Sequence, residues 1–302
     1  MPVRSKWQSL PTEAINPSTL AIDKQSAADI VEGMLNEDRK MLAAVQREKE
    51  RIAVGIDIIT QALRKGGRLV FVGAGTSGRL GIVESAEMPP TFGTRPELVQ
   101  AIMAGGKSAI LKPKEGVEDN YEEGARAIMR LRPTKLDVVI GVSASGMTQF
   151  VRGALTRARR ANSKIVFVTC DPRTELQTFV DLTIAPAVGP EVIAGSTRLK
   201  AGTAQKLVLN MISTIAMVRL GKTFGNLMVD LRATNDKLRE RAIRIVQTVT
   251  GSDREVAEAA LLATDWEVKP AILVLERGLA VDEARRRLAL DGRLRHVLEE
   301  DA

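Results

Sequence analysis

Five short apolar runs, separated by segments of helical periodicity, constrain the fold of this chain more than any other feature. The runs are residues 68–73, 98–104, 137–142, 164–169 and 182–185. Helical patterns lie between them, near residues 78–87, 119–131 and 148–161. Strands that alternate with helices are typical of a parallel sheet covered on both faces. The sequence therefore predicts an α/β fold with a doubly wound, five-stranded parallel sheet flanked by helices.

Helical patterns also lie outside the predicted sheet. An extended arm over residues 1–22 precedes an N-terminal helical segment, and a long apolar helix is expected over residues 201–221. After residue 235 the pattern changes to short charged helices, of which we expect three. We therefore expect a sheet-bearing domain over residues 1–235 and a small helical, UBA-like domain over residues 236–302.

The scarcity of histidine and cysteine excludes several classes of site. The chain has one His and one Cys among 302 residues, too few for a His/Cys zinc site, a disulfide framework or an iron–sulfur cluster. We expect no metal and no redox cofactor. The lone cysteine, the absence of an apolar run of ~20 residues and the lack of an apolar core in the first ten residues predict a cytoplasmic protein without a signal peptide.

The positive charge belongs to the predicted sheet domain. The formal net charge is +7, whereas residues 236–302 hold 12 Lys/Arg and 14 Asp/Glu, which leaves +9 for residues 1–235. The densest basic run, Arg157 to Arg160, reads as a solvated helix face. Only nine aromatic residues are present, which argues against single-strand stacking. We expect a small anionic substrate rather than nucleic acid or a membrane.

A glycine-rich turn follows the first predicted strand. Gly73 to Gly78 matches G-x-G-x-x-G and opens a helix, as a dinucleotide site requires. However, the next strand ends without an acidic residue for a ribose hydroxyl, and no Lys-Ser/Thr follows Gly78 to make a Walker A loop. The hydroxyls of Thr76 and Ser77 suit a terminal phosphate. We therefore predict that Thr76, Ser77 and Gly78 bind a phosphate group.

A second hydroxyl-rich loop follows the third predicted strand. It contains Ser143, Ser145, Gly146 and Thr148 and opens another helix, whose amides and dipole favour a dianion. The alternative is that Ser143 and Thr148 are merely helix caps. Two such loops at strand ends of one sheet favour phosphate binding, because ligands of α/β sheets bind at that edge.

These loops resemble the sugar isomerase (SIS) fold, and the likeness extends along nearly the whole chain to the N-acetylmuramic acid 6-phosphate etherase family. The segments that carry it are Thr12-Glu13…Asn16, residues 73–81, residues 84–93 and residues 189–206. The last segment is long and specific. The chain departs from the family pattern at Met147 and Gln149, where Arg and Pro are usual.

The resemblance implies a carbon–oxygen lyase that cleaves the C3 lactyl ether of N-acetylmuramic acid 6-phosphate, in amino-sugar catabolism and peptidoglycan recycling. By the family motif, Glu87 protonates the departing lactate oxygen and Glu118 removes the C2 proton. Read without the family, Glu118 is an ordinary first-turn carboxylate favoured by the helix dipole. Further candidate substrate contacts are Glu191, Ser196, Thr197 and Lys200; Glu191 could instead pair with an Arg, and Lys200 could be a surface residue.

Two other functions stay open at this point. A non-catalytic phosphosugar-sensing regulator would share the architecture, but it would have no reason to keep both Glu87 and Glu118. An aldose–ketose sugar-phosphate isomerase commonly uses a His to open the sugar ring, and the only His here, His296, lies near the C-terminus. By analogy with two-domain SIS enzymes, we expect a homodimer.

Overall fold

The computed structural model describes residues 10–300. Residues 1–9, which belong to the predicted extended arm and on which the prediction of no signal peptide rests, lie outside the described residues. The chain forms two compact units. The first takes in Glu97–Ser213 together with the chain up to Ser85, and the second takes in Ala86–Pro96 together with the chain from Thr214 onward.

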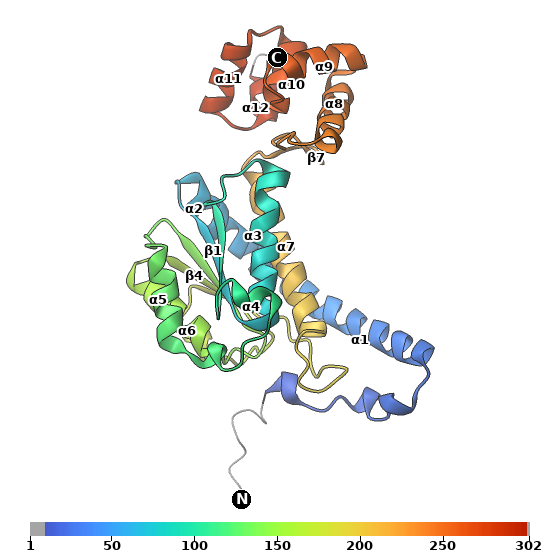
Figure 1. The fold of residues 1–302 in the computed structure, drawn as a ribbon, viewed down its shortest axis with the longest axis vertical. Helices are drawn as coiled ribbons and strands as arrows, with labels where there is room; N and C mark the ends of the chain where they lie inside the picture. Colours follow the sequence, from blue (N-terminus) through green and yellow to red (C-terminus); the bar gives the residue numbers. More distant parts are fainter. Residues whose placement is uncertain (1–9, 301–302) are drawn as a thin grey trace, which may run out of the picture. The chain divides into compact units, whose positions relative to one another are not determined.

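The first unit contains the predicted five-stranded parallel sheet, in the order β2-β1-β3-β4-β5 (Figure 1). The strands are β1 (Leu69–Gly73), β2 (Val99–Met103), β3 (Val138–Val142), β4 (Lys164–Val168) and β5 (Leu182–Ile184). β1 and β3 are buried along their whole length. Continuous apolar runs of this kind are what a parallel sheet needs when helices cover both of its faces.

Helices cover the two faces of the sheet. Those of the first unit are α1 (Ala27–Arg47), α2 (Lys49–Arg64), α3 (Gly75–Phe92), α4 (Ser108–Leu111), α5 (Tyr121–Arg130), α6 (Gln149–Arg160) and α7 (Lys200–Arg219); α3 and α7 also contribute to the second unit. α5 and α6 share a buried cluster with Val70 and Val139. α3 packs on Phe71 at Gly81, and therefore on the opposite face, because successive side chains of a strand alternate.

The backbones of α5 and α6 lie in direct contact. A Cβ on Gly124 would lie 1.9 Å from the Phe150 carbonyl oxygen, and a Cβ on Gly153 would lie 2.0 Å from the Tyr121 carbonyl oxygen. Only glycine fits at these two positions. The close approach fixes α6, whose N-terminus follows the second hydroxyl-rich loop.

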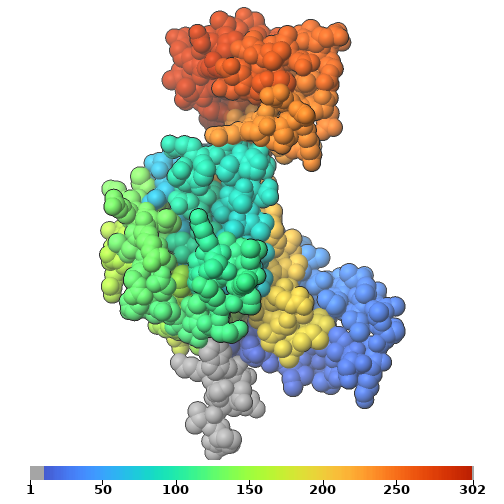
Figure 2. Space-filling model, in the orientation of Figure 1, coloured from blue at the N-terminus to red at the C-terminus, as the bar shows by residue number. Residues whose placement is uncertain are grey.

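The N-terminal segment packs against the loop that precedes α7. Three short 3-10 helices, η2 (Pro11–Glu13), η3 (Pro17–Thr19) and η4 (Ile22–Lys24), lead into α1. Thr19 Oγ1 donates to the Val192 carbonyl (2.9 Å), and the Gly195 amide donates to the Thr12 carbonyl (3.2 Å). Figure 2 shows the two segments side by side, in blue and in yellow.

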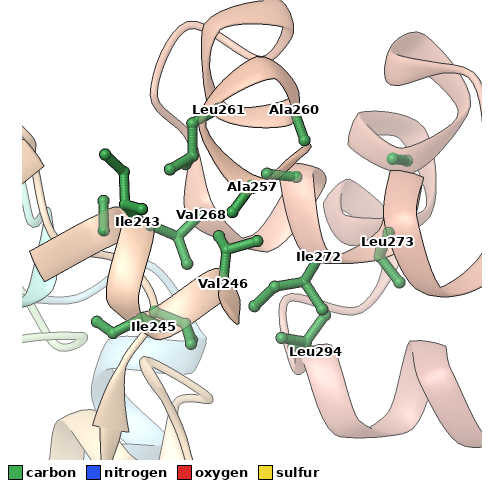
Figure 3. Packing of buried hydrophobic residues seen from close by; sticks show 14 of the residues in the cluster. Ile243, Ile245, Val246, Ala257, Ala260, Leu261, Val268, Ile272, Leu273 and Leu294 are labelled. Atoms are coloured by element: carbon green, nitrogen blue, oxygen red, sulfur yellow. The ribbon is translucent and has the colours of Figure 1, made fainter. Parts of the chain in front are cut away.

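The second unit is helical and has its own core. Between α7 and its helices lies a small hairpin of β6 (Thr223–Phe224) and β7 (Leu227–Met228). Five helices follow within the described residues: α8 (Asp236–Thr250), α9 (Arg254–Ala263), α10 (Val268–Arg277), α11 (Val281–Leu290) and α12 (Leu294–Glu299). The three short helices that the sequence predicts correspond to α9, α10 and α11, and α8 and α12 are additional. Figure 3 shows buried side chains of these helices, including Val246, Ile272 and Leu294, meeting in one apolar core.

Among residues 10–300, no helix is both long enough and apolar enough to cross a bilayer.

Candidate active site

The first hydroxyl-rich loop is a tight strand-to-helix turn. β1 ends at Gly73 and α3 begins at Gly75. A Cβ on Gly73 would lie 2.6 Å from the Gly78 nitrogen, and a Cβ on Gly78 would lie 2.8 Å from the Gly73 oxygen. Both glycines are therefore required for the turn to close. As a result, Thr76 and Ser77 lie in the first turn of α3, where backbone amides and the helix dipole attract anions.

The N-terminal part of α7 packs directly on this first loop. Ser77 Oγ donates a buried hydrogen bond to Gln205 Oε1 (2.8 Å). A Cβ on Gly202 would lie 3.4 Å from Thr76 Cγ2, so α7 also lies against Thr76. Sequence reasoning did not single out Gln205, although it lies within the quoted segment 189–206.

The second hydroxyl-rich loop connects β3 to α6. Ser143 Oγ and Thr148 Oγ1 form a hydrogen bond of 2.8 Å, and Ser145 Oγ accepts from the Met147 amide at 3.3 Å. Thr148 occupies the N-cap position of α6, but its side chain makes no capping hydrogen bond. Capping by its hydroxyl therefore does not account for Thr148. Gly146 has a φ of +73° and packs closely against Thr174.

The two loops leave neighbouring strands at one edge of the sheet. β1 and β3 pair in parallel, with Gly73 opposite Val142. From β1 the chain passes through α3 to β2, which lies on one side of the β1–β3 pair. From β3 it passes through α6 to β4, which lies on the other side of that pair, and α6 covers the opposite face of the sheet from α3. The strand order thus reverses between β1 and β3. Such a reversal opens a crevice at the carboxyl ends of the strands, where ligands of open α/β sheets bind.

Cys170 links the second loop to α7. The Cys170 amide donates to the Ala144 carbonyl (2.9 Å), and its thiol lies 3.9 Å from the Ala201 carbonyl oxygen. Burial raises the pKa of this thiol, and the charge of Glu191 raises it further. Cys170 is thus an inert packing residue. Through it and through Ser77, both loops are held against the start of α7.

The segment before α7 places two predicted site residues inside the protein. The fully buried Glu191 carboxylate accepts from the amides of Lys200 and Ala201, both at 2.9 Å, and so caps α7. Burial raises the pKa of Glu191, although these hydrogen bonds oppose the rise. Lys200 is also buried, and its Nζ donates to Glu37 Oε2 at 2.6 Å. Lys200 is therefore not a surface residue. The charge of Lys200 is paired with Glu37, and the carboxylate of Glu191 accepts two backbone hydrogen bonds.

Ser196 and Thr197 lie in the turn just before α7. Both are partly exposed, and the Thr197 carbonyl accepts from the Gly202 amide at 2.9 Å. No side-chain hydrogen bond from either hydroxyl is present among the described residues. Their hydroxyls are therefore available to a ligand.

Glu118 lies in the short helix η5 (Val117–Asp119), immediately before α5, and η5 packs against α6. Glu118 is exposed to solvent. Partial desolvation raises the pKa of Glu118, and the like charges of Asp119 and Glu115 raise it further. An accessible carboxylate with a raised pKa is a stronger base than an ordinary glutamate.

Glu87 lies in the part of α3 that belongs to the second unit, and it is exposed. The expectation that Glu87 ends its helix is wrong. α3 continues through Pro89 and Pro90 to Phe92, and the Gly93 amide donates to the Pro89 carbonyl (3.0 Å). The prolines occupy the last turn, where they remove only two helical amides.

The described residues contain no cluster of side chains that could bind a metal ion. Among the described residues, no three His, Cys, Asp or Glu side chains lie close enough together to hold a metal ion. The single histidine, His296, lies in α12 and contacts Asp291 at 3.1 Å. The chemistry that the site offers is that of hydroxyls, helix amides and carboxylates.

Two family models match the chain. The N-terminal SIS domain of glucokinase regulatory protein matches residues 51–159, which include both hydroxyl-rich loops. The C-terminal lid domain of glucokinase regulatory protein matches residues 225–271.

Relatives of known name cover nearly the whole chain. The chain is 52% identical over 296 residues to an N-acetylmuramic acid 6-phosphate etherase of Salinibacter ruber, covering 97% of this chain and 95% of the relative. It is 50% identical over 281 residues to one of Clostridium beijerinckii, covering 93% and 92%. A solved phosphoheptose isomerase of Francisella tularensis aligns with a TM-score of 0.52 at 18% identity, covering 64% of this chain and 100% of that one, and this likeness concerns the fold alone.

Proposed function

The chain belongs to the N-acetylmuramic acid 6-phosphate etherase family and is therefore a lyase, and on that premise we propose that it cleaves the lactyl ether at C3 of N-acetylmuramic acid 6-phosphate. Water is consumed, and the products are N-acetylglucosamine 6-phosphate and D-lactate. The observation that carries this proposal is the pair of hydroxyl-rich loops at the strand reversal between β1 and β3. A dianionic sugar phosphate suits these two helix N-termini.

In the proposed reaction the phosphate anchors the sugar and two carboxylates move protons. Thr76, Ser77 and the second loop hold the phosphate. In the open-chain sugar, Glu118 removes the C2 proton, which the C1 aldehyde acidifies. The C3–O bond then breaks, and Glu87 protonates the lactate oxygen.

The second half of the reaction adds water to the unsaturated aldehyde. Glu118 first releases the C2 proton to solvent, from which Glu87 is reprotonated. Glu118 then takes a proton from water as the water oxygen forms its bond to C3. A proton returns to C2, so the overall change is the replacement of lactate by hydroxyl. The raised pKa of Glu118 supports its role as the base in both halves.

D-Lactate release tests this proposal directly. We expect purified protein, treated with a chelator, to release D-lactate from N-acetylmuramic acid 6-phosphate without added nicotinamide. An enzyme-coupled D-lactate assay measures the rate. Binding of the sugar phosphate without lactate release would support the regulator instead, and formation of a ketose phosphate would support the isomerase.

We also propose that the protein is a cytoplasmic homodimer. The support for a dimer is a row of exposed apolar side chains on α1: Val31, Leu35 and Leu42 are each about half exposed. Exposed apolar rows of this kind are typical of protein interfaces. The support for a reducing compartment is that the one cysteine is a free, buried thiol.

A further inference from the structure

The side-chain amide of Gln205 is buried, and only its oxygen has a hydrogen-bond partner among the described residues. The residue is fully buried on α7, and its Oε1 accepts from Ser77 Oγ at 2.8 Å. Its Nε2 is also buried and has no hydrogen-bond partner among the described residues. Buried amide donors are nearly always paired. An unpaired donor beside a candidate phosphate ligand therefore points to a role of Gln205 in ligand binding.

The two orientations of this amide have opposite effects on Ser77. The amide oxygen and nitrogen have nearly the same shape, so either can face the serine. When Oε1 faces Ser77, the hydroxyl directs its only proton at Gln205 and has none for an anion. When Nε2 faces Ser77, Gln205 donates and the Ser77 oxygen accepts. The hydroxyl proton is then free for a phosphate oxygen, and Nε2 gains an acceptor.

We propose that Gln205 is a positioning residue: its Nε2 donates to Ser77 Oγ when substrate is bound, and so makes the Ser77 hydroxyl a phosphate donor. The inference rests on the proposed function, because it takes Ser77 to contact the phosphate. α7 is well suited to hold the amide in place. Glu191 caps the helix, and Gly202 brings it against Thr76.

Four variants separate positioning from structural support. Gln205→Met removes both polar atoms at similar size, Ser77→Ala removes the hydroxyl, and the double variant removes both. The matched control is Ser213→Ala. Ser213 Oγ donates to Glu84 Oε2 at 2.7 Å, and this bond is also buried and also joins α7 to α3. Thermal melts of each variant establish that it is folded.

The readouts are KM and kcat for N-acetylmuramic acid 6-phosphate and the inhibition constant of inorganic phosphate. We expect Ser77→Ala to raise KM and the inhibition constant by roughly 10-fold or more, and Gln205→Met to raise them by roughly 5-fold, with kcat little changed. The double variant should resemble Ser77→Ala alone, because Gln205 acts through that hydroxyl. Ser213→Ala should change neither constant.

Three results would overturn the inference. If Gln205→Met weakens phosphate binding by the same factor with and without Ser77, the amide does not act through the hydroxyl. If Ser77→Ala weakens phosphate binding but Gln205→Met does not, Gln205 has no positioning role, and the proposed function stands. If Ser77→Ala itself leaves both constants unchanged, the phosphate contact of Ser77 fails together with the inference.

Discussion

At the scale of single residues, the ion pair of Lys200 and Glu37 joins the start of α7 to α1 in a buried setting. Removing Lys200 takes away the buried partner of Glu37 and leaves the buried carboxylate with only the exposed Lys40 to pair with it. We expect Lys200→Met to lower the free energy of unfolding by about 3–5 kcal/mol. The control is Lys40→Met, because Lys40 pairs with the same carboxylate from an exposed position and should matter by at most about 1 kcal/mol. Urea unfolding measures both; equal losses would contradict the prediction.

The same pair predicts a pH dependence of stability. Burial alone would raise the pKa of Glu37, but hydrogen bonds from Lys200 and Lys40 outweigh it and lower the pKa to about 2. A carboxylate with a lowered pKa stabilises the folded protein above the unfolded-state pKa, and this contribution is lost as pH falls toward 2. We therefore expect the melting temperature to depend less on pH in Glu37→Gln than in the wild type. Thermal melts between pH 5, above the ordinary pKa of glutamate, and pH 2 measure this dependence.

Glu118 carries a prediction about activity. If it is the C2 base, Glu118→Gln should lower kcat roughly 100-fold or more and abolish exchange of the C2 hydrogen with deuterated water. The base must be ionised, so kcat/KM should fall as pH drops through its raised pKa. Asp119→Asn removes a like charge and should move this acid limb to lower pH. Exchange at the wild-type rate in Glu118→Gln would rule out the assignment.

At the scale of elements, the surroundings of two helical glycines, one at the contact of α5 with α6 and one in α1, predict opposite effects of Gly→Ala changes. Gly153→Ala should destabilise the protein by about 3 kcal/mol, because its Cβ would lie 2.0 Å from a carbonyl oxygen. Gly33→Ala, inside α1 with nothing within 4 Å, should stabilise it by roughly 0.5–1 kcal/mol. Differential scanning calorimetry measures both; a stabilising Gly153→Ala would mean that the helices separate freely.

The elements were predictable where a local pattern encodes them. The five strands are short apolar runs, and both hydroxyl-rich loops follow such runs, so sequence alone located them. The end of α3 was not predictable, because Pro89-Pro90 reads as a stop, whereas the helix continues to Phe92 without the two hydrogen bonds that the prolines cannot donate. α8 and α12 were missed, although Asn235 is a strong N-cap for α8 and Ala242, Ile245 and Val246 recur at helical spacing within it.

At the scale of the whole molecule, the contacts that build the site could not be predicted. Ser77 meets Gln205 across 128 positions and Lys200 meets Glu37 across 163. No local sequence pattern indicates that Glu37 is the partner of Lys200, which the sequence predicts as a substrate contact. Sequence reasoning therefore found the hydroxyls of the site but not the residues that hold them in place.

Assembly is the prediction that belongs to this scale. If the apolar row on α1 is the dimer interface, Leu35→Glu should yield monomers, because an unpaired charge cannot be buried there. Light scattering after size exclusion measures the mass. Leu262→Glu changes a similarly exposed leucine on α9 and should leave the mass unchanged. A dimer that survives Leu35→Glu would exclude this face.

The 163-residue span between Glu37 and Lys200 also has a consequence for synthesis. At about 5–20 residues per second, α1 leaves the ribosome roughly 10–30 s before its partner lysine exists. During that interval Glu37 can pair only with Lys40 on its own helix, so the buried contact of α1 with α7 cannot form. The contact of α1 with α7, and with it the contact of Ser77 with Gln205 at the first loop, is therefore completed only after the start of α7 has been synthesised.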